Sequence, residues 1–262
     1  TDGGATFTSI RANNNGSFIN PSDFDDNGNA FYAAYTSGNY TRLLTANTST
    51  TWTNVAIAAF NSGRVTAVRA APVTANRVFF GLNNGRVVRV DNANAATPTA
   101  THINASGGMP ASASVSCIEV ENDDDNHLLV TYSNYGVTSV WETKNGGTTW
   151  TAVEGNLPDM PVRWALFNPT DSSQALIATE VGVWSTDLLN GAATVWGPSN
   201  NGLANVRTDM LQIRSSDKLI IAATHGRGLF STDYFSPARA DFVADRFITY
   251  TGKPVTFTDG SV

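Results

Sequence analysis

A glycine-ended hairpin recurs five times along this chain, and no other feature constrains the fold as strongly. Each copy has a short apolar strand, a tight turn that ends in glycine and a second alternating strand, as in HLLVTYSNYGVTSVWET. Successive turn glycines are 46 to 51 residues apart. A period of this length with about four strands per unit is typical of β-propeller blades and not of helical solenoids. The turn glycines are Gly38, Gly85, Gly136, Gly182 and Gly228.

The order of strands within each unit follows from the same alignment of repeats. An inner strand comes first, then a polar turn, then the hairpin, and then a fourth strand that begins with Thr-Trp in two units. No segment has a sustained 3.6-residue apolar period, so we expect almost no helix. A single unit has two apolar faces and can bury both only by stacking on its neighbours. The sequence therefore predicts an all-β propeller of about five four-stranded antiparallel blades. We expect inner strands at residues 18–20, 65–72, 115–121, 162–169 and 209–215, the first of them followed by a polar turn at residues 21–29.

The composition indicates a folded chain and excludes two kinds of partner. Of the 262 residues, 41% are hydrophobic and only 15% are charged, which is too apolar for a disordered tail. A net charge of −6 would repel a polyanion, so we expect no nucleic-acid partner. No apolar run approaches the ~18 residues that a membrane-spanning helix needs. The single cysteine, Cys117, cannot form an internal disulfide, and we interpret it as a buried strand residue.

A second pattern recurs at the turn before Trp150. Residues 143–150, TKNGGTTW, follow the spacing S/T-x-D/N-x-G-x-T-W. Two further segments follow it in part, one before Trp52 and one at the start of the chain. The pattern resembles the Asp-box, or BNR repeat, of sialidase, xyloglucanase and sortilin-like β-propellers, and the resemblance covers about residues 1–235. The matching positions are Asp2, Gly4, Thr6 and Phe7; Asn47, Thr51 and Trp52; and Asn145, Gly147, Thr149 and Trp150.

This resemblance implies a structural role for the motif. In the family, the Asp-box is the hairpin between the third and fourth strands of a blade, on the outer rim and away from the central funnel where ligands bind. Its carboxylate or amide accepts hydrogen bonds from turn N–H groups, its glycine allows positive φ, and its aromatic side chain packs between blades. We therefore expect a fold element that carries no chemistry.

The last residues of the chain differ from the repeats. ADFVADRFITYTGKPVTFTDGSV has alternating apolar residues around a Gly-Lys-Pro turn. It resembles the start of a PKD-like immunoglobulin-fold domain, a β-sandwich common in bacterial surface proteins, but a full sandwich needs about 100 residues. We therefore predict two domains. Residues 1–235 form the propeller, and residues 236–262 form the first strands of a truncated sandwich.

Two interpretations of the propeller domain remain open. Asp2 and Asp233 both occupy the Asp-box position, which favours a domain that is incomplete at its N-terminus and has further blades upstream. Alternatively, residues 6–10 complete the unit that begins at Asp209 and close a five-bladed ring.

Candidate catalytic residues do not form a recognisable set. The F/Y-R-I-P motif of sialidases is absent, and the nearest sequences lie around Arg69 and Arg163. Hydrolysis by paired carboxylates needs two of them ~5–10 Å apart across a cleft, and no sequence spacing singles out such a pair. We therefore expect no catalytic residue here. The alternative is a glycoside hydrolase of the Asp-box type whose catalytic residues lie partly outside this segment. The acidic candidates are Glu119, Glu121, Glu142, Glu154 and Glu180.

One acidic segment has the spacing of a metal site. Asp23, Asp25, Asn27 and Asn29 in DFDDNGN resemble the D-x-D-x-N-G spacing of calcium loops, in which alternate oxygens surround a hard cation. No bidentate glutamate follows at the expected distance, and ordinary β-turn chemistry explains the same residues. Calcium is thus the one cofactor candidate.

Four tryptophans allow two interpretations. Trp141, Trp164, Trp184 and Trp196 could form a platform that stacks on sugars, or they could belong to the core between blades. The core interpretation is favoured.

Together these features predict a non-catalytic β-propeller module of a large secreted or cell-surface bacterial protein. Such a module would bind a protein or a glycan at the cell surface, as an adhesin does. It could also join other subunits of a surface assembly as a rigid scaffold. Fold alone does not distinguish these roles from the enzymatic alternative, because propellers host both.

Overall fold

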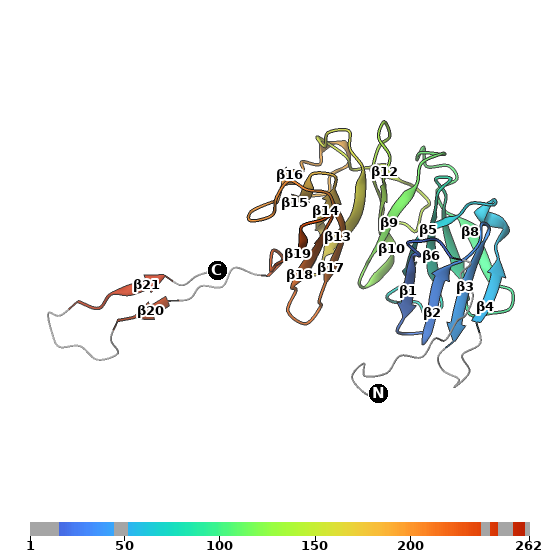
Figure 1. The fold of residues 1–262 in the computed structure, drawn as a ribbon, viewed down its shortest axis with the longest axis horizontal. Helices are drawn as coiled ribbons and strands as arrows, with labels where there is room; N and C mark the ends of the chain where they lie inside the picture. The colour runs from blue at the N-terminus through green and yellow to red at the C-terminus, as the bar shows by residue number, and fades with distance from the viewer. Residues whose placement is uncertain (1–15, 45–51, 237–241, 246–253, 260–262) are drawn as a thin grey trace.

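The computed structural model describes residues 16–44, 52–236, 242–245 and 254–259, and it shows an all-β chain (Figure 1). Five antiparallel sheets follow one another along the sequence, four of them with four strands and the fifth with three. Within each sheet, neighbouring strands are also consecutive in the chain. The expectation of an all-β fold built from units of about four antiparallel strands is therefore confirmed.

The strands have the following bounds. The first sheet contains β1 (Ser22–Asp25), β2 (Ala30–Ala34), β3 (Asn39–Leu44) and β4 (Trp52–Ala56). The second contains β5 (Val65–Ala70), β6 (Val78–Leu82), β7 (Val87–Asp91) and β8 (Thr99–His102). The third contains β9 (Val115–Glu121), β10 (Asp124–Tyr132), β11 (Val140–Thr143) and β12 (Thr151–Ala152). The fourth contains β13 (Val162–Asn168), β14 (Asp171–Thr179), β15 (Gly182–Thr186) and β16 (Gly197–Pro198). The fifth contains β17 (Thr208–Ile213), β18 (Ile220–Thr224) and β19 (Gly228–Thr232).

Helix is scarce, as expected. In the part of the chain that the structure describes, it is confined to two 3-10 turns, η1 (Ala58–Phe60) and η2 (Gly191–Ala193). No helix among these residues is long and apolar enough to span a membrane.

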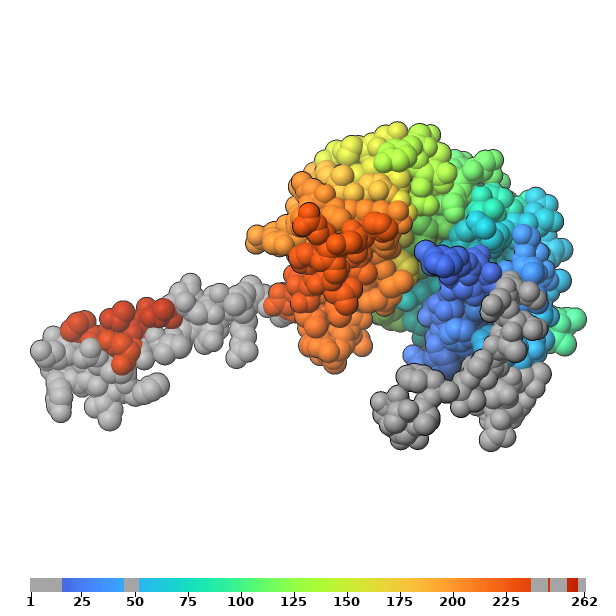
Figure 2. Space-filling model, viewed as in Figure 1, coloured from blue at the N-terminus to red at the C-terminus, as the bar shows by residue number. Residues whose placement is uncertain are grey.

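The five sheets pack against one another in chain order. The first strands of consecutive sheets are in contact, β1 with β5, β5 with β9, β9 with β13 and β13 with β17. An apolar core fills each of the four junctions between neighbouring sheets. Figure 2 shows the resulting arc, which runs from the blue first sheet to the orange fifth sheet.

Strand β6 shows why the second sheet packs against a neighbour on both faces. All five of its residues are buried. Val78 and Phe80 belong to the core shared with the first sheet, whereas Phe79 belongs to the core shared with the third sheet. A Cβ atom at Gly81 would lie 2.3 Å from Val115 Cγ1 of the third sheet, so this close approach requires glycine. A strand buried on both faces appears in sequence as the continuous apolar run VFFGL.

The turn glycines of the repeat all adopt the left-handed backbone conformation. Their φ angles lie between 71° and 98°. Each glycine lies just before or at the start of the third strand of its sheet, where the chain reverses direction. Glycine enters this region of φ without the steric cost that other residues meet. The hairpins predicted from the repeat are thus confirmed.

The expectation of a strand at residues 18–20 followed by a polar turn at 21–29 is wrong. Strand β1 occupies Ser22–Asp25, inside the segment that was expected to turn. Two aspartates of this strand use their carboxylates to accept backbone N–H groups from the second sheet. Polar side chains can be buried in a strand when they have such partners, so an acidic sequence did not exclude a strand here.

The described residues of the C-terminal segment form a separate hairpin. Strands β20 (Phe242–Ala244) and β21 (Phe257–Asp259) pair antiparallel, with Phe242 opposite Asp259. The division at residue 235 and the PKD-like assignment remain predictions.

We predict that Phe80→Ala lowers the free energy of unfolding by about 3–5 kcal/mol, the range for truncating a buried phenylalanine. Phe80 is fully buried, and its ring centroid lies 5.0 Å from that of Tyr40 and 5.2 Å from that of Phe60. Phe24→Ala is the matched control, because Phe24 is 41% exposed; it should cost less than about 1 kcal/mol. Urea unfolding measures both losses, and equal losses would contradict the packing described here.

Candidate functional site

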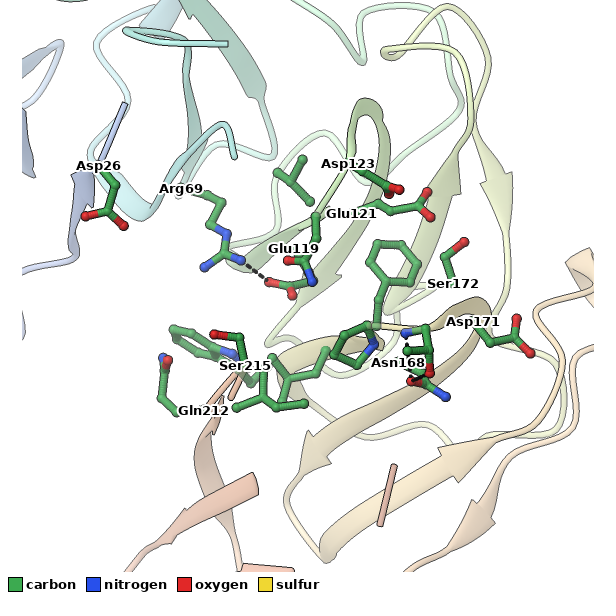
Figure 3. A pocket seen from close by; sticks show the side chains of 18 residues that line it. Asp26, Arg69, Glu119, Glu121, Asp123, Asn168, Asp171, Ser172, Gln212 and Ser215 are labelled. Atoms are coloured by element: carbon green, nitrogen blue, oxygen red, sulfur yellow. Dashed lines mark hydrogen bonds and ion pairs between the residues drawn. The ribbon is translucent and has the colours of Figure 1, made fainter. Parts of the chain in front are cut away.

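One cavity is lined by residues from all five sheets (Figure 3). Its volume is about 640 Å³, within the usual range for sites that bind small ligands. Asp26 directly follows β1, while Arg69, Glu119, Trp164 and Gln212 lie on β5, β9, β13 and β17. Because these are the first strands of the five sheets, the cavity lies on the side where those strands converge.

Two residues that line this cavity, Arg69 and Glu119, form an ion pair. Arg69 Nη2 lies 3.2 Å from Glu119 Oε2, and the Glu119 side chain is almost completely buried. Burial raises the pKa of Glu119 to about 7, because desolvation of the carboxylate outweighs the attraction of Arg69. The nearby carboxylate of Asp23 acts in the same direction. Glu119 can therefore hold a proton at pH values where most carboxyl groups are ionised.

A second carboxylate of the same strand is held by a buried histidine. Glu121 Oε2 lies 2.6 Å from His127 Nδ1, and Glu142 Oε1 lies 2.8 Å from His127 Nε2. The two carboxylates raise the pKa of His127 although its burial opposes protonation. The His127 ring also packs on Phe167 at 4.5 Å between centroids. This arrangement stabilises the imidazolium form of His127.

The cavity carries more negative than positive charge. Arg69 is the one lysine or arginine in its lining. Among the described residues, three of the lining carboxylates have no cationic partner, whereas Arg69 and His127 balance the other two. Such a cavity repels anionic ligands and favours neutral or cationic groups. Its acidic lining residues are Asp26, Glu119, Glu121, Asp123 and Asp171.

The structure places two of the acidic candidates side by side. Glu119 and Glu121 are two residues apart on β9, so their side chains project from the same face with Cα atoms about 7 Å apart. Their surroundings differ, because Glu119 is desolvated and Glu121 is paired with His127. The sequence signal was the alternation of the two glutamates along a strand, but their partners Arg69 and His127 became apparent only in the fold.

The other acidic candidates have partners elsewhere. Glu142 bonds His127 on the far side of the ring, and Glu154 Oε1 accepts the Ser139 N–H at 2.9 Å. Glu180, in the turn between β14 and β15, forms an ion pair with Arg163 of β13 within the fourth sheet.

The turn between β11 and β12 is held by hydrogen bonds from its own side chains. Asn145 Oδ1 accepts the Thr149 N–H at 2.9 Å, and Asn145 Nδ2 donates to Thr149 Oγ1 at 2.8 Å. Thr143 Oγ1 accepts the Gly147 N–H at 3.0 Å. The amide side chain thus organises the turn as a backbone acceptor would.

Trp150 fixes this turn to the neighbouring sheet. Its side chain belongs to the core between the second and third sheets, and its Nε1 donates to Ile103 O at 2.9 Å. Gly147 adopts a φ of +90°, and a Cβ atom there would lie 2.6 Å from Ile103 Cβ. Both the glycine and the tryptophan are therefore needed for the close contact with the preceding repeat.

The other two copies of the motif fall largely outside the described residues. Trp52 begins β4, and its ring lies edge-on to Phe31 at 5.8 Å between centroids. The residues that cannot be placed are Asp2, Gly4, Thr6, Phe7, Asn47 and Thr51.

The aspartates of the candidate calcium segment connect the first and second sheets. Asp23 Oδ2 accepts the Ala70 N–H at 2.8 Å. Asp25 Oδ2 accepts the Asn76 N–H at 2.6 Å, and its Oδ1 accepts the Gly28 N–H at 2.7 Å. Both carboxylates thus serve as acceptors for backbone groups.

The two asparagines of that segment lie in the turn after β1. Asn27 Nδ2 donates to Pro72 O at 2.7 Å, and Asn29 has a φ of +47°. No group of three or more His, Cys, Asp or Glu side chains in the described ranges is arranged to hold a metal ion. Calcium binding remains a prediction.

The tryptophans are distributed among the cores. Trp196 is buried between the third and fourth sheets, and its Nε1 donates to Val153 O at 2.8 Å. Trp141, Trp164 and Trp184 are partly buried against three different cores. Of the four, only Trp164 lines the cavity, which favours the core interpretation.

Two comparisons with known proteins found no relative. No family model matches the chain, and no curated protein matches it either. The functional argument therefore depends on the motifs and on the geometry of the cavity.

We predict that Trp150→Ala lowers the free energy of unfolding by about 3–5 kcal/mol, because it removes a buried aromatic side chain. Asn145→Ala should cost about 1 kcal/mol through lost turn hydrogen bonds. Asn145→Asp is the control, since it keeps an acceptor for the Thr149 N–H. Thermal melts compare the variants, and a melting temperature of Trp150→Ala equal to that of the wild type would show that the turn is not structural.

We predict that stability falls as the pH rises from about 5 to 8. The folded-state pKa of Glu119 is raised to about 7, so the folded protein binds this proton more tightly than the unfolded chain does. The raised pKa of His127 acts in the same direction, because its contribution is lost as the pH rises through that pKa. The Glu119 contribution is roughly 2–3 kcal/mol. Urea unfolding at several pH values measures it, and Glu119→Gln should flatten the profile between pH 5 and 7.

Proposed function

We propose that residues 1–235 form a non-catalytic β-propeller of the Asp-box type. The module would belong to a large secreted or cell-surface bacterial protein and serve in adhesion, ligand binding or as a scaffold. The observation that carries the proposal is a polar cavity lined by residues on or next to the first strands of all five sheets. Propellers bind ligands at the point where their inner strands converge.

The turn at residues 143–150 supports the Asp-box assignment. Its amide accepts a turn N–H, its glycine has positive φ, and its tryptophan packs against the preceding sheet. It lies between the third and fourth strands of its sheet, as in the family that the motif resembles. None of its residues lines the cavity, which agrees with a structural role.

The charge of the cavity supports a neutral or cationic ligand. Five carboxylates face one arginine there, so a sialic acid or another acidic sugar would be repelled. Lining hydroxyl and amide groups such as Thr170, Ser172 and Gln212 can hydrogen-bond a neutral sugar or a protein side chain.

A specific observation keeps the glycoside hydrolase as the second candidate. Glu119 and Glu121 project from the same face of β9 into the cavity, and burial raises the pKa of Glu119 to about 7, as a general acid requires. Glu119 could then act as the general acid and Glu121, which is bonded to His127, as the base. The ion pair of Glu119 with Arg69 argues against this role, because the Glu119 carboxyl group already has a partner when no substrate is bound.

We predict that the cavity binds neutral oligosaccharides in preference to sialylated ones, and that it hydrolyses neither. Titration calorimetry with lactose, β-glucan oligosaccharides and sialyllactose measures the preference. Asp123→Asn with Asp171→Asn should improve binding of sialyllactose relative to lactose, because two negative charges are removed. Asp233→Asn, outside the cavity, is the control.

Two results would count against this proposal. Failure of every neutral oligosaccharide to bind would contradict a glycan-binding role for the cavity. Release of reducing sugar that is abolished by Glu119→Gln or Glu121→Gln would replace the proposal with the hydrolase.

A further inference from the structure

A groove between the first and second sheets contains a buried cation. It has a volume of about 570 Å³ and lies between β4 with its following turn, residues 53–59, and residues 96–100 at the start of β8. Arg42 of β3 lines the groove and is only 6% exposed. The groove is separate from the cavity described above, and the two share no lining residue.

The guanidinium of Arg42 is incompletely paired. Its Nη1 donates to Ala93 O at 2.5 Å and to Ala95 O at 2.6 Å. Its Nε is buried and has no acceptor. No Asp or Glu oxygen of the described residues lies within 4.0 Å of it, whereas Arg69 and Arg77 each have a carboxylate partner.

A buried guanidinium without a counterion is costly, since two carbonyl dipoles replace water only in part. None of the residues that line the groove is acidic, so the protein supplies no counterion there. An anion that enters the groove would be attracted to Arg42 and would balance its charge. The planar donors of arginine match a carboxylate particularly well.

The walls of the groove limit the size and polarity of such an anion. They consist largely of small apolar side chains, among them Ala56, Ala58, Ala59 and Pro98, with Ile57 beside them. We propose that this groove binds a monocarboxylate with a compact aliphatic body, held by the guanidinium of Arg42. The carboxylate can belong to a free small acid or to the C-terminus of a peptide. This proposal does not depend on the function proposed for the cavity.

The test is the thermal stability of the whole chain with defined probes. Sodium butyrate should raise the melting temperature of the wild type by a few degrees at saturating concentration, because it binds only the folded state. Butyramide has the same shape without the charge and should leave the melting temperature unchanged. Sodium chloride at the ionic strength of the butyrate sample is the control for a general salt effect. N-Acetylalanine and its amide repeat the comparison for the C-terminus of a peptide. A response to butyrate alone indicates a free small acid, and a response to N-acetylalanine alone indicates a chain terminus.

Two variants assign the effect to Arg42. Arg42→Gln should lose the butyrate response. Arg89→Gln should keep it, because Arg89 already pairs with Asp91 at 3.0 Å and does not line the groove. If Arg42→Gln does not fold, the Arg42 Nε–H resonance of the wild type is followed during a butyrate titration.

Several outcomes would overturn the proposal. They are an unchanged melting temperature with both acids, an equal response in Arg42→Gln, or an Arg42 resonance that does not shift saturably. An equal response to phosphate would show a general anion effect and would refute the carboxylate class.

Discussion

The second, third and fourth sheets bury apolar side chains on both faces, and the rest of the structure depends on that constraint. In β6, Phe80 enters one core and Phe79 enters the next, so the second sheet is stable only between two neighbours. Alone, such a sheet would expose both apolar faces to water, and stacking on its neighbours buries them. Stacking therefore builds the fold, and the arc of sheets and the cavity along their first strands follow from it.

Hydrogen bonds between sheets add orientation to this apolar stacking. Backbone N–H groups of residues 73–76 in the second sheet donate hydrogen bonds to two carboxylates. One is Asp25 of the first sheet and the other is Asp125 of the third. Trp150 joins the third sheet to a backbone carbonyl of the preceding repeat. Because apolar contacts have little directionality, such polar links determine how neighbouring sheets are aligned.

The distribution of charge gives the two concave surfaces opposite preferences. Carboxylates dominate the cavity shared by all five sheets, where Arg69 and His127 balance only two of them. Arg42 is the charged residue in the groove between the first and second sheets. The two proposals therefore assign ligands of different charge to these two surfaces.

The sequence by itself determined the repeating unit. Gly38 and Gly85 showed where hairpins turn, because positive φ is a local property, and the runs between them showed strands with two buried faces. It also indicated the turn held by Asn145, whose hydrogen bonds are all within a few residues. The tertiary structure alone decided which side chains meet. Glu121 meets His127 and Glu119 meets Arg69 only after strands pair and sheets stack. The fold likewise places two backbone carbonyls beside Arg42 and, among the residues that the structure describes, no carboxylate. Burial and pairing depend on residues distant in sequence, so local patterns cannot specify the charge of a site.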